Sequence, residues 1–299
     1  MNWGAAAVPF AGLALALLGG ARGAAAADVP RPGQRWVPQL GNLAPRGKGI
    51  WIRSLGHYGL DADSTAKLVA DYGFQWVCMN VVWQMRDGKH KRPAKQSFPR
   101  FAEALAARGI ACWIFGWAER GFEGDFLREL EYRMSSSPYV AGIICNAEKS
   151  YITSKARSQA ATLAQGMRSL AGGRIGWGLT SYGGGPQSVP AFPWREWALP
   201  GCIGFPQIYD MRNNLGSAYP RRSYTRWAEA GFAPICPIWG ASNMKTVNQM
   251  IEISNNTPSA QAVSWWDFYW VIQSARTRSP YRAQFVLDFP ADSRFQYSR

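Results

Sequence analysis

Asn146 and Glu148 are the residues of this sequence whose types and spacing are best suited to chemistry. They end an apolar run, Tyr139–Tyr151 (YVAGIICNAEKSY), whose small and β-branched residues predict a strand buried on both faces. Side chains alternate along a strand, so Asn146 and Glu148 are expected to project together at its carboxyl end. A carboxylate is costly at the end of a buried strand, so the presence of Glu148 needs a reason. It could take part in proton transfer, or it could be a loop side chain that is solvated or paired with Lys149.

The elements that must position these residues alternate between strand-like and helix-like segments. Helical spacing follows Asp61, a predicted cap, and Gly73 and Gly109 end the first two predicted helices. Eight strand-then-helix units predict an α/β fold, a single (β/α)8 TIM barrel whose active residues lie at the carboxyl ends of the strands. The predicted strands are Gly49–Leu55, Phe74–Trp83, Ile110–Trp117, Val140–Asn146, Arg174–Thr180, Cys202–Tyr209, Phe232–Trp239 and Ala260–Asp267. The predicted helices cover residues 61–72, 96–108, 123–134, 153–170, 194–198, 219–230 and 245–254, and a last one begins near Val271.

The amino-terminal segment predicts export. Residues 1–27 are apolar and end in an Ala-x-Ala site at Ala25–Ala27, as in a secretory signal peptide, although no Lys or Arg precedes the apolar core. Residues 28–48 are rich in Pro and Gly and are expected to form a linker or an arm on the barrel surface. Residues 49–299 would then form the barrel domain, and the protein would be secreted or periplasmic, with no stable membrane span once the leader is removed.

Composition limits the partners. The net charge of +14 favours an anionic partner, such as an acidic cell-wall polymer, but no dense basic run predicts specific nucleic-acid binding. The 15 tryptophans suggest stacking on sugar rings or another flat ligand. All five cysteines fall in apolar runs without metal-site or redox spacing, so we expect small buried thiols rather than disulfides.

The predicted strand ends bring acids, amides and aromatic residues to the barrel mouth. Only two histidines, His57 and His90, are present, without HExxH or paired cysteines, so neither a metal site nor a serine–histidine triad is predicted. No GxGxxG follows the first strand, and no cofactor is expected. Such a mouth points to glycoside hydrolysis, with Glu148 as the acid, its pKa raised by burial among Trp117, Trp239 and Trp265. The residues expected at the mouth are Arg53, Asn80, Trp83, Trp117, Glu119, Asn146, Glu148, Thr180, Tyr182, Gln207, Tyr209, Asp210, Trp239, Trp265, Trp266 and Asp267.

Three short motifs resemble the group of barrel glycosidases that contains the family 18 chitinases, the family 25 lysozymes and the family 85 endo-N-acetylglucosaminidases. Asn146-Ala147-Glu148 resembles the fourth-strand Asn-x-Glu of the family 85 enzymes. Residues 206–211 (PQIYDM) resemble the sixth-strand Tyr-Asp of chitinases, and Trp265-Trp266 resembles the eighth-strand Trp under the sugar. The chitinase DxxDxDxE pattern is absent, because Gly142, Ile143 and Asn146 replace most of its acids.

The resemblance implies roles for these residues. Glu148 would be the general acid, Asn146 would orient the N-acetyl group whose carbonyl oxygen is the nucleophile, and Tyr209 and Asp210 would support the reacting centre. Glu119 offers an alternative: a Glu119–Glu148 pair roughly 5 Å apart would support a retaining mechanism without substrate assistance, and a wider gap would indicate inversion. Substrate binding would involve Arg53, Asn80, Trp83, Trp117, Tyr182, Gln207, Trp239, Trp265, Trp266 and Asp267.

The function expected from these residues is hydrolysis of an N-acetylhexosamine-containing polysaccharide, such as a cell-wall or chitin-like polymer. Two other functions are compatible with the same residues. A glycan-binding barrel without catalysis, for example an adhesion or phage-associated module, would use the same aromatic floor, and Asn146 in place of Asp favours it. A structural barrel that engages anionic polymer through its positive charge would show binding that falls steeply with salt.

Overall fold

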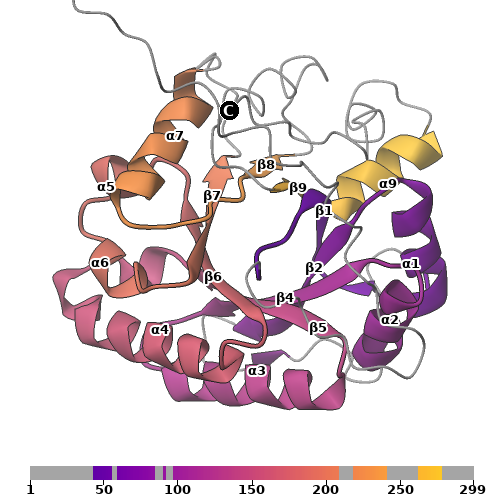
Figure 1. Cartoon of the computed structure of the whole chain (residues 1–299), viewed down its shortest axis with the longest axis horizontal. Helices are drawn as coiled ribbons and strands as arrows, with labels where there is room; N and C mark the ends of the chain where they lie inside the picture. The colour runs from indigo at the N-terminus through magenta and orange to yellow at the C-terminus, as the bar shows by residue number, and fades with distance from the viewer. Residues whose placement is uncertain are drawn as a thin grey trace, which may run out of the picture.

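The computed structural model describes residues 43–55, 59–84, 90–91, 97–208, 218–240 and 262–277. These residues form a ring of strands with helices around its outside (Figure 1). The predicted signal peptide, most of the predicted arm and His57 lie outside the described residues, as do Tyr209 and Asp210.

Eight parallel strands close into a barrel, which confirms the predicted (β/α)8 fold. Each strand pairs with the next, and β1 closes the ring by pairing with both β2 and β9. The remaining strand of the nine-stranded sheet, β3 (His90–Lys91), pairs antiparallel with the end of β2. The barrel strands are β1 (Gly47–Ile52), β2 (Trp76–Gln84), β4 (Ala111–Ala118), β5 (Val140–Ala147), β6 (Gly176–Tyr182), β7 (Cys202–Ile208), β8 (Ile238–Gly240) and β9 (Ala262–Trp266).

The helices begin and end largely where caps and glycines predict. The Asp61 side chain accepts a hydrogen bond from the Ser64 amide at 2.7 Å and so caps the first helix, and Gly172 ends the fourth in the left-handed region, with φ of 55°. The predicted helix over residues 245–254 lies outside the described residues, and no described helix is long and apolar enough to cross a membrane. The helices within the described residues are α1 (Ala62–Asp71), α2 (Ser97–Ala106), α3 (Glu123–Ser136), α4 (Arg157–Ala171), α5 (Gly185–Ser188), α6 (Trp194–Trp197), α7 (Ala218–Glu229) and α9 (Phe268–Thr277), with 3-10 turns η2 (Lys149–Tyr151) and η3 (Ser154–Ala156).

Alternation along the strands divides the apolar residues into two layers. One layer fills the barrel interior with large aromatic side chains, including Trp51, Trp76 and Trp113. The other lies between the strands and the helices and contains mainly aliphatic residues such as Ile143 and Leu163. Because successive side chains of a strand point to opposite faces, each barrel strand contributes alternately to both layers.

Glycines make room for one interior indole. Trp113 is 1% exposed, and a Cβ atom added at Gly142 or Gly176 would lie 2.3 Å or 2.1 Å from its six-membered ring. Both glycines therefore hold positions on β5 and β6 that a larger residue could occupy only if Trp113 moved.

The seventh barrel strand is shorter than predicted. The expected strand Phe232–Trp239 is reduced to β8 (Ile238–Gly240), preceded by a single bridge between Ile235 and Gly204. Pro234 and Pro237 explain the difference, because proline has no N–H to donate to a neighbouring strand. Pro206, in contrast, lies within β7 in register with Ser181.

All five cysteines are free and buried, as expected. Burial raises the pKa of each thiol, to about 12 for Cys112. They therefore stay protonated at neutral pH and act as small apolar side chains.

Substituting Gly142 by Ala is expected to lower the free energy of unfolding by about 1–3 kcal/mol, because the new methyl group overlaps the Trp113 ring. Chemical denaturation would measure the change. Gly124→Ala is the matched control: Gly124 lies on α3, where a Cβ meets only the end of the flexible Arg128 side chain at 3.4 Å. The free energy of unfolding of this control should rise by roughly 0.5–1 kcal/mol, because Ala favours the helix more than Gly does. Equal effects of the two substitutions would contradict the packing argument.

Candidate active site

Four neighbouring strands bring polar side chains to one part of the barrel mouth. The parallel register places Trp117 of β4 beside Asn146 of β5, and Asn146 beside Thr180 of β6. Further along β6, Tyr182 is in register with Gln207 of β7. The carboxyl ends of these strands lie on the same side of the barrel, so residues up to 90 positions apart in sequence meet there.

The amide nitrogen of Gln207 joins three of these strand ends. Nε2 lies 3.0 Å from Glu148 Oε1, 3.1 Å from Asn146 Oδ1 and 3.3 Å from Thr180 Oγ1. Since an amide nitrogen carries two hydrogens, the three oxygens share two donors. Asn146 and Thr180 are 4% and 1% exposed, and this shared donor satisfies oxygens that would otherwise be buried without a partner.

Glu148 is half-buried, at the point where β5 turns into η2. In addition to Gln207, the indole Nε1 of Trp117 donates to Glu148 Oε1 at 3.4 Å. Burial raises the pKa of the nearby Tyr182 phenol, and the charge of Glu148 raises it further. Glu148 is thus surrounded by an amide, an indole and a phenol, a set able to bind and orient a hydroxylated ligand.

A buried hydrogen bond behind Glu148 anchors this turn. The Tyr151 hydroxyl donates to Glu123 Oε1 at 3.0 Å, and the Gly121 amide donates to the same carboxylate at 2.9 Å and 3.1 Å. The Tyr151 amide in turn donates to the carbonyl of Glu148 at 2.9 Å. The start of α3 therefore holds the backbone of Glu148, a connection that the sequence did not reveal because Tyr151 and Glu123 form no recognisable motif.

A second group of mouth residues surrounds Trp266. The Nε atom of Arg53 lies 2.6 Å from Asp267 Oδ2, and its guanidinium lies 4.9 Å above the Trp266 ring. Burial raises the pKa of Asp267, and Arg53 and the amides of Tyr269 and Trp270 oppose that increase. Trp266 also contacts Trp117 edge-to-face at 6.3 Å, which links this group to Glu148.

The structure does not bring every expected residue to this mouth. Trp239 and Trp265 were expected in the sugar-stacking floor beside Glu148, but they are 1% and 0% exposed and pack in the layer between strands and helices. The physical reason is alternation: they are in register with each other on β8 and β9, and their neighbour Trp266 takes the inward side. Of the three tryptophans expected to bury Glu148, Trp117 is the one that contacts it.

Three other expected residues have distinct surroundings. Asn80 is fully buried on β2, and neither of its side-chain polar atoms has a hydrogen-bond partner among the described residues. Glu119 is half-buried. Burial is the main cause that raises the pKa of Tyr151, and the charge of Glu119 adds a smaller contribution, whereas Glu148 faces Gln207 and Trp117. Trp83 lies in β2, opposite Lys91 of β3.

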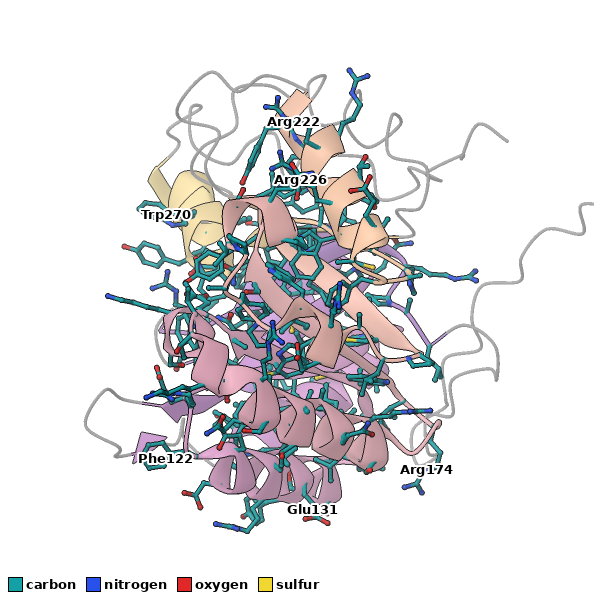
Figure 2. All side chains as sticks on the ribbon, turned by 90° about the vertical axis from the view of Figure 1, so that its left-hand side faces the viewer. Phe122, Glu131, Arg174, Arg222, Arg226 and Trp270 are labelled. Carbon is teal, nitrogen blue, oxygen red and sulfur yellow. The ribbon has the colours of Figure 1, made fainter. Side chains whose placement is uncertain are left out.

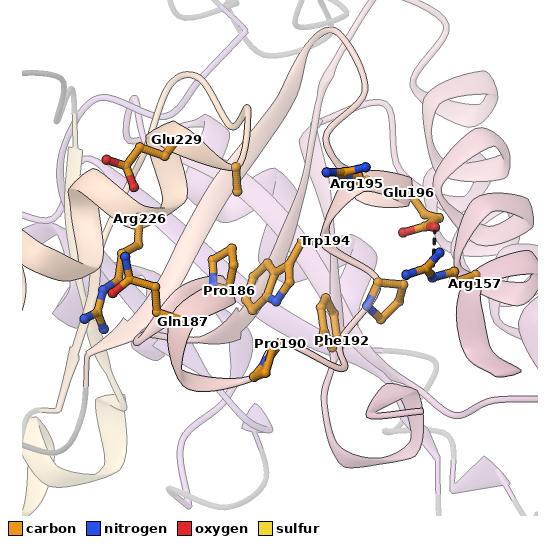
Figure 3. A pocket seen from close by; sticks show the side chains of 12 residues that line it. Arg157, Pro186, Gln187, Pro190, Phe192, Trp194, Arg195, Glu196, Arg226 and Glu229 are labelled. Carbon is orange, nitrogen blue, oxygen red and sulfur yellow. Dashed lines mark ion pairs between the residues drawn. The ribbon is translucent and has the colours of Figure 1, made fainter. Parts of the chain in front are cut away.

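A separate cleft of about 530 Å³ lies on the outer wall of the barrel (Figure 3). Phe192 and Trp194 line it, and Arg157 and Glu196 form an ion pair of 3.7 Å across one end. None of the mouth residues lines this cleft. Its charged groups are surface residues, without the buried amide and carboxylate pairing found at the mouth, so we place the chemistry at the mouth.

Among the described residues, no group of three or more His, Cys, Asp or Glu side chains could hold a metal ion. What the described mouth offers is a carboxylate, amides, a hydroxyl, indoles and a guanidinium. These groups suit proton transfer and hydrogen bonding to a polar ligand.

Comparison with solved structures identifies the fold as one that glycoside hydrolases use. The spore cortex-lytic enzyme SleL of Bacillus megaterium QM B1551 superposes with a TM-score of 0.57 at 6% identity, over 77% of this chain and 72% of that one. The active domain 2 of a thermostable chitinase from Pyrococcus furiosus gives 0.54 at 8% identity, over 76% and 85%. The ICChI chitinase from Ipomoea carnea gives 0.53 at 11% identity, over 75% and 95%.

No protein-family model and no curated protein sequence matches the chain. At these identities the similarity establishes the (β/α)8 fold, which this chain shares with these glycoside hydrolases.

Replacing Gln207 by Glu tests the shared-amide geometry through pH. The substitution places a second carboxyl group about 3 Å from Glu148. Because two negative charges at this distance repel each other, the pair should keep one proton in the folded state at a pH where the same groups in the unfolded chain have lost it. Because the folded state then binds more protons, stability should fall relative to the parent as pH rises from about 4 to about 7, by roughly 1 kcal/mol or more.

Urea unfolding of the variant across this pH range gives the measurement. Gln207→Leu is the control, since it removes the hydrogen-bond donor without adding a charge. Its free energy of unfolding should be lower than that of the parent by an amount that does not change with pH. Parallel pH profiles for Gln207→Glu and Gln207→Leu would contradict the placement of Gln207 beside Glu148.

Proposed function

We propose that the protein is a glycoside hydrolase that cleaves an N-acetylhexosamine-containing polysaccharide of the cell-wall or chitin-like type, and that it acts outside the cytoplasm. The observation that carries the proposal is the arrangement around Gln207: one amide holds Glu148 and Asn146 together at the carboxyl ends of parallel strands. The glycoside hydrolase-like fold supports the same reaction class, and in such barrels this end of the strands carries the active residues.

In the proposed reaction, Glu148 donates its proton to the glycosidic oxygen as the bond to the anomeric carbon breaks. Asn146 positions the N-acetyl group, whose carbonyl oxygen attacks that carbon and forms a cyclic intermediate that water then opens. Since Asn146 Oδ1 accepts from Gln207, its amide nitrogen is left to contact the substrate. Tyr209 and Asp210 are proposed to support the reacting centre, and Glu119 is the alternative second carboxyl group if the N-acetyl group takes no part.

The second candidate is a barrel that binds the glycan without cleaving it. The observation that favours it is that Trp117 and Gln207 both donate hydrogen bonds to Oε1 of Glu148, so this side-chain oxygen already has two partners within the protein.

Substituting Glu148 by Gln should separate these candidates. If Glu148 is the acid, reducing-end release by the full chain from peptidoglycan, chitin oligomers or another polysaccharide should fall at least about 100-fold, because a positioned proton donor typically contributes 10²–10⁴. The amide keeps the shape of the side chain, so the thermal unfolding midpoint should change little.

The matched control is Glu229→Gln, the same change on the exposed end of α7, which should leave the rate at the parental value. An unchanged rate in Glu148→Gln would remove Glu148 as the acid. Glycan binding by the parent without release from any substrate would establish the second candidate instead.

A further inference from the structure

Arg53 is held at the barrel mouth by a buried partner. Its Nε atom is buried and lies 2.6 Å from Asp267, a carboxylate that is 1% exposed. The Tyr269 amide donates to the other oxygen of Asp267 at 3.1 Å and fixes the orientation of that carboxylate. Since Asp267 follows β9 and Arg53 follows β1, two paired strands determine where the guanidinium stands.

The guanidinium lies over the ring of Trp266, which was expected from the sequence to stack on a sugar. It lies 4.9 Å over Trp266, while Trp51, Phe115 and Trp117 surround the same indole edge-to-face at 6.2, 5.9 and 6.3 Å. A glycan that enters here therefore meets a cation stacked on Trp266 rather than an open aromatic face.

Part of Arg53 remains accessible. Its side chain is 40% exposed although Nε is buried, and its closest contact with Asp267 is made by Nε rather than by either of the two terminal nitrogens. These nitrogens form a planar fork whose geometry matches the two oxygens of a carboxylate. The net charge of +14 also favours the approach of anionic ligands.

We infer that the mouth binds a glycan that carries a carboxylate, and that the terminal nitrogens of Arg53 receive that group while Asp267 and Trp266 hold the guanidinium in place. The carboxylate could belong to a uronic acid or to a lactyl ether on a hexosamine, and both present the same two oxygens to the fork. The inference rests on the proposed function for the identity of the ligand as a glycan, but it concerns binding and does not require cleavage.

Titration calorimetry with the full-length Glu148→Gln variant tests the inference without turnover. The ligands are oligogalacturonate, for the uronic acid, and N-acetylglucosamine–N-acetylmuramic acid oligomers, for the lactyl ether, each compared with its carboxyl-reduced form. We expect the carboxylate form of at least one pair to bind about tenfold more tightly than its reduced form, as one charge-assisted hydrogen-bonded contact provides. The pair that shows the preference identifies the source of the carboxylate.

Arg53→Gln, added to Glu148→Gln, should abolish this preference. Because Arg53→Gln leaves Asp267 buried without its partner, Arg53→Gln with Asp267→Asn provides a second test in which no buried charge is left unpaired. The matched control is Arg174→Gln, which removes one exposed positive charge just before β6. Figure 2 shows Arg174 on the opposite side of the molecule from Phe122, a residue of the loop that follows the carboxyl end of β4. This control should keep the preference, since the loss of one distant charge changes only the screened long-range field.

Equal affinities for the carboxylate and reduced forms, or a preference that survives both Arg53 variants, would overturn the inference, as would failure of both acidic ligands to bind. Failure of the proposed function looks different. If the parent releases no reducing ends from any substrate but the preference is present and depends on Arg53, hydrolysis is wrong and the carboxylate site stands. If hydrolysis depends on Glu148 but acidic and reduced glycans bind alike, the proposed hydrolysis stands and the carboxylate site is wrong.

Discussion

The closure of eight parallel strands is the constraint on which the rest of the structure depends. Pairing of β1 with both β2 and β9 places all carboxyl ends on one rim, so that side chains from distant parts of the sequence converge without a local motif. Gln207 shows the consequence most directly, because its amide contacts residues of β5 and β6 that lie 61 and 27 positions earlier. Arg53 and Asp267 meet for the same reason, from the first and the last barrel strands.

Closure also accounts for much of the tryptophan content. The interior of an eight-stranded barrel must be filled by side chains, and Trp51, Trp76 and Trp113 help to fill it here, with glycines of β5 and β6 against Trp113. Trp239 and Trp265 serve the outer layer instead. The aromatic residues therefore stabilise the barrel first, and the indoles that remain half-buried at the mouth, Trp117 and Trp266, make contacts that position Glu148 and Arg53.

The fold was predictable because alternation of apolar runs and helical spacing persists through the chain, and a closed barrel follows from eight such units. The strand that was overestimated, at residues 232–239, is the one that contains two prolines, where apolar content and hydrogen-bonding capacity give opposite indications. The residues around Glu148 were predictable as a set, since strand ends converge. Their contacts were not: whether an indole such as Trp265 faces the interior or the helices depends on register, which changes sides with a shift of one residue. Tyr151 and Glu123 were missed because their connection exists only in three dimensions.

The two halves of the mouth have opposite electrostatic characters, and this bears on how a ligand would lie. Around Glu148, neutral donors from Gln207 and Trp117 contact an acidic side chain. Around Trp266, a guanidinium is the outermost group and Asp267 is buried beneath it. A glycan with one carboxylate would therefore bind in a single orientation, with its anionic group at Arg53 and a neutral ring towards Glu148, because the guanidinium provides charge-assisted hydrogen bonds that the neutral donors of Gln207 and Trp117 do not. The pair of indoles, Trp117 and Trp266, in contact at 6.3 Å, joins these two halves of the mouth.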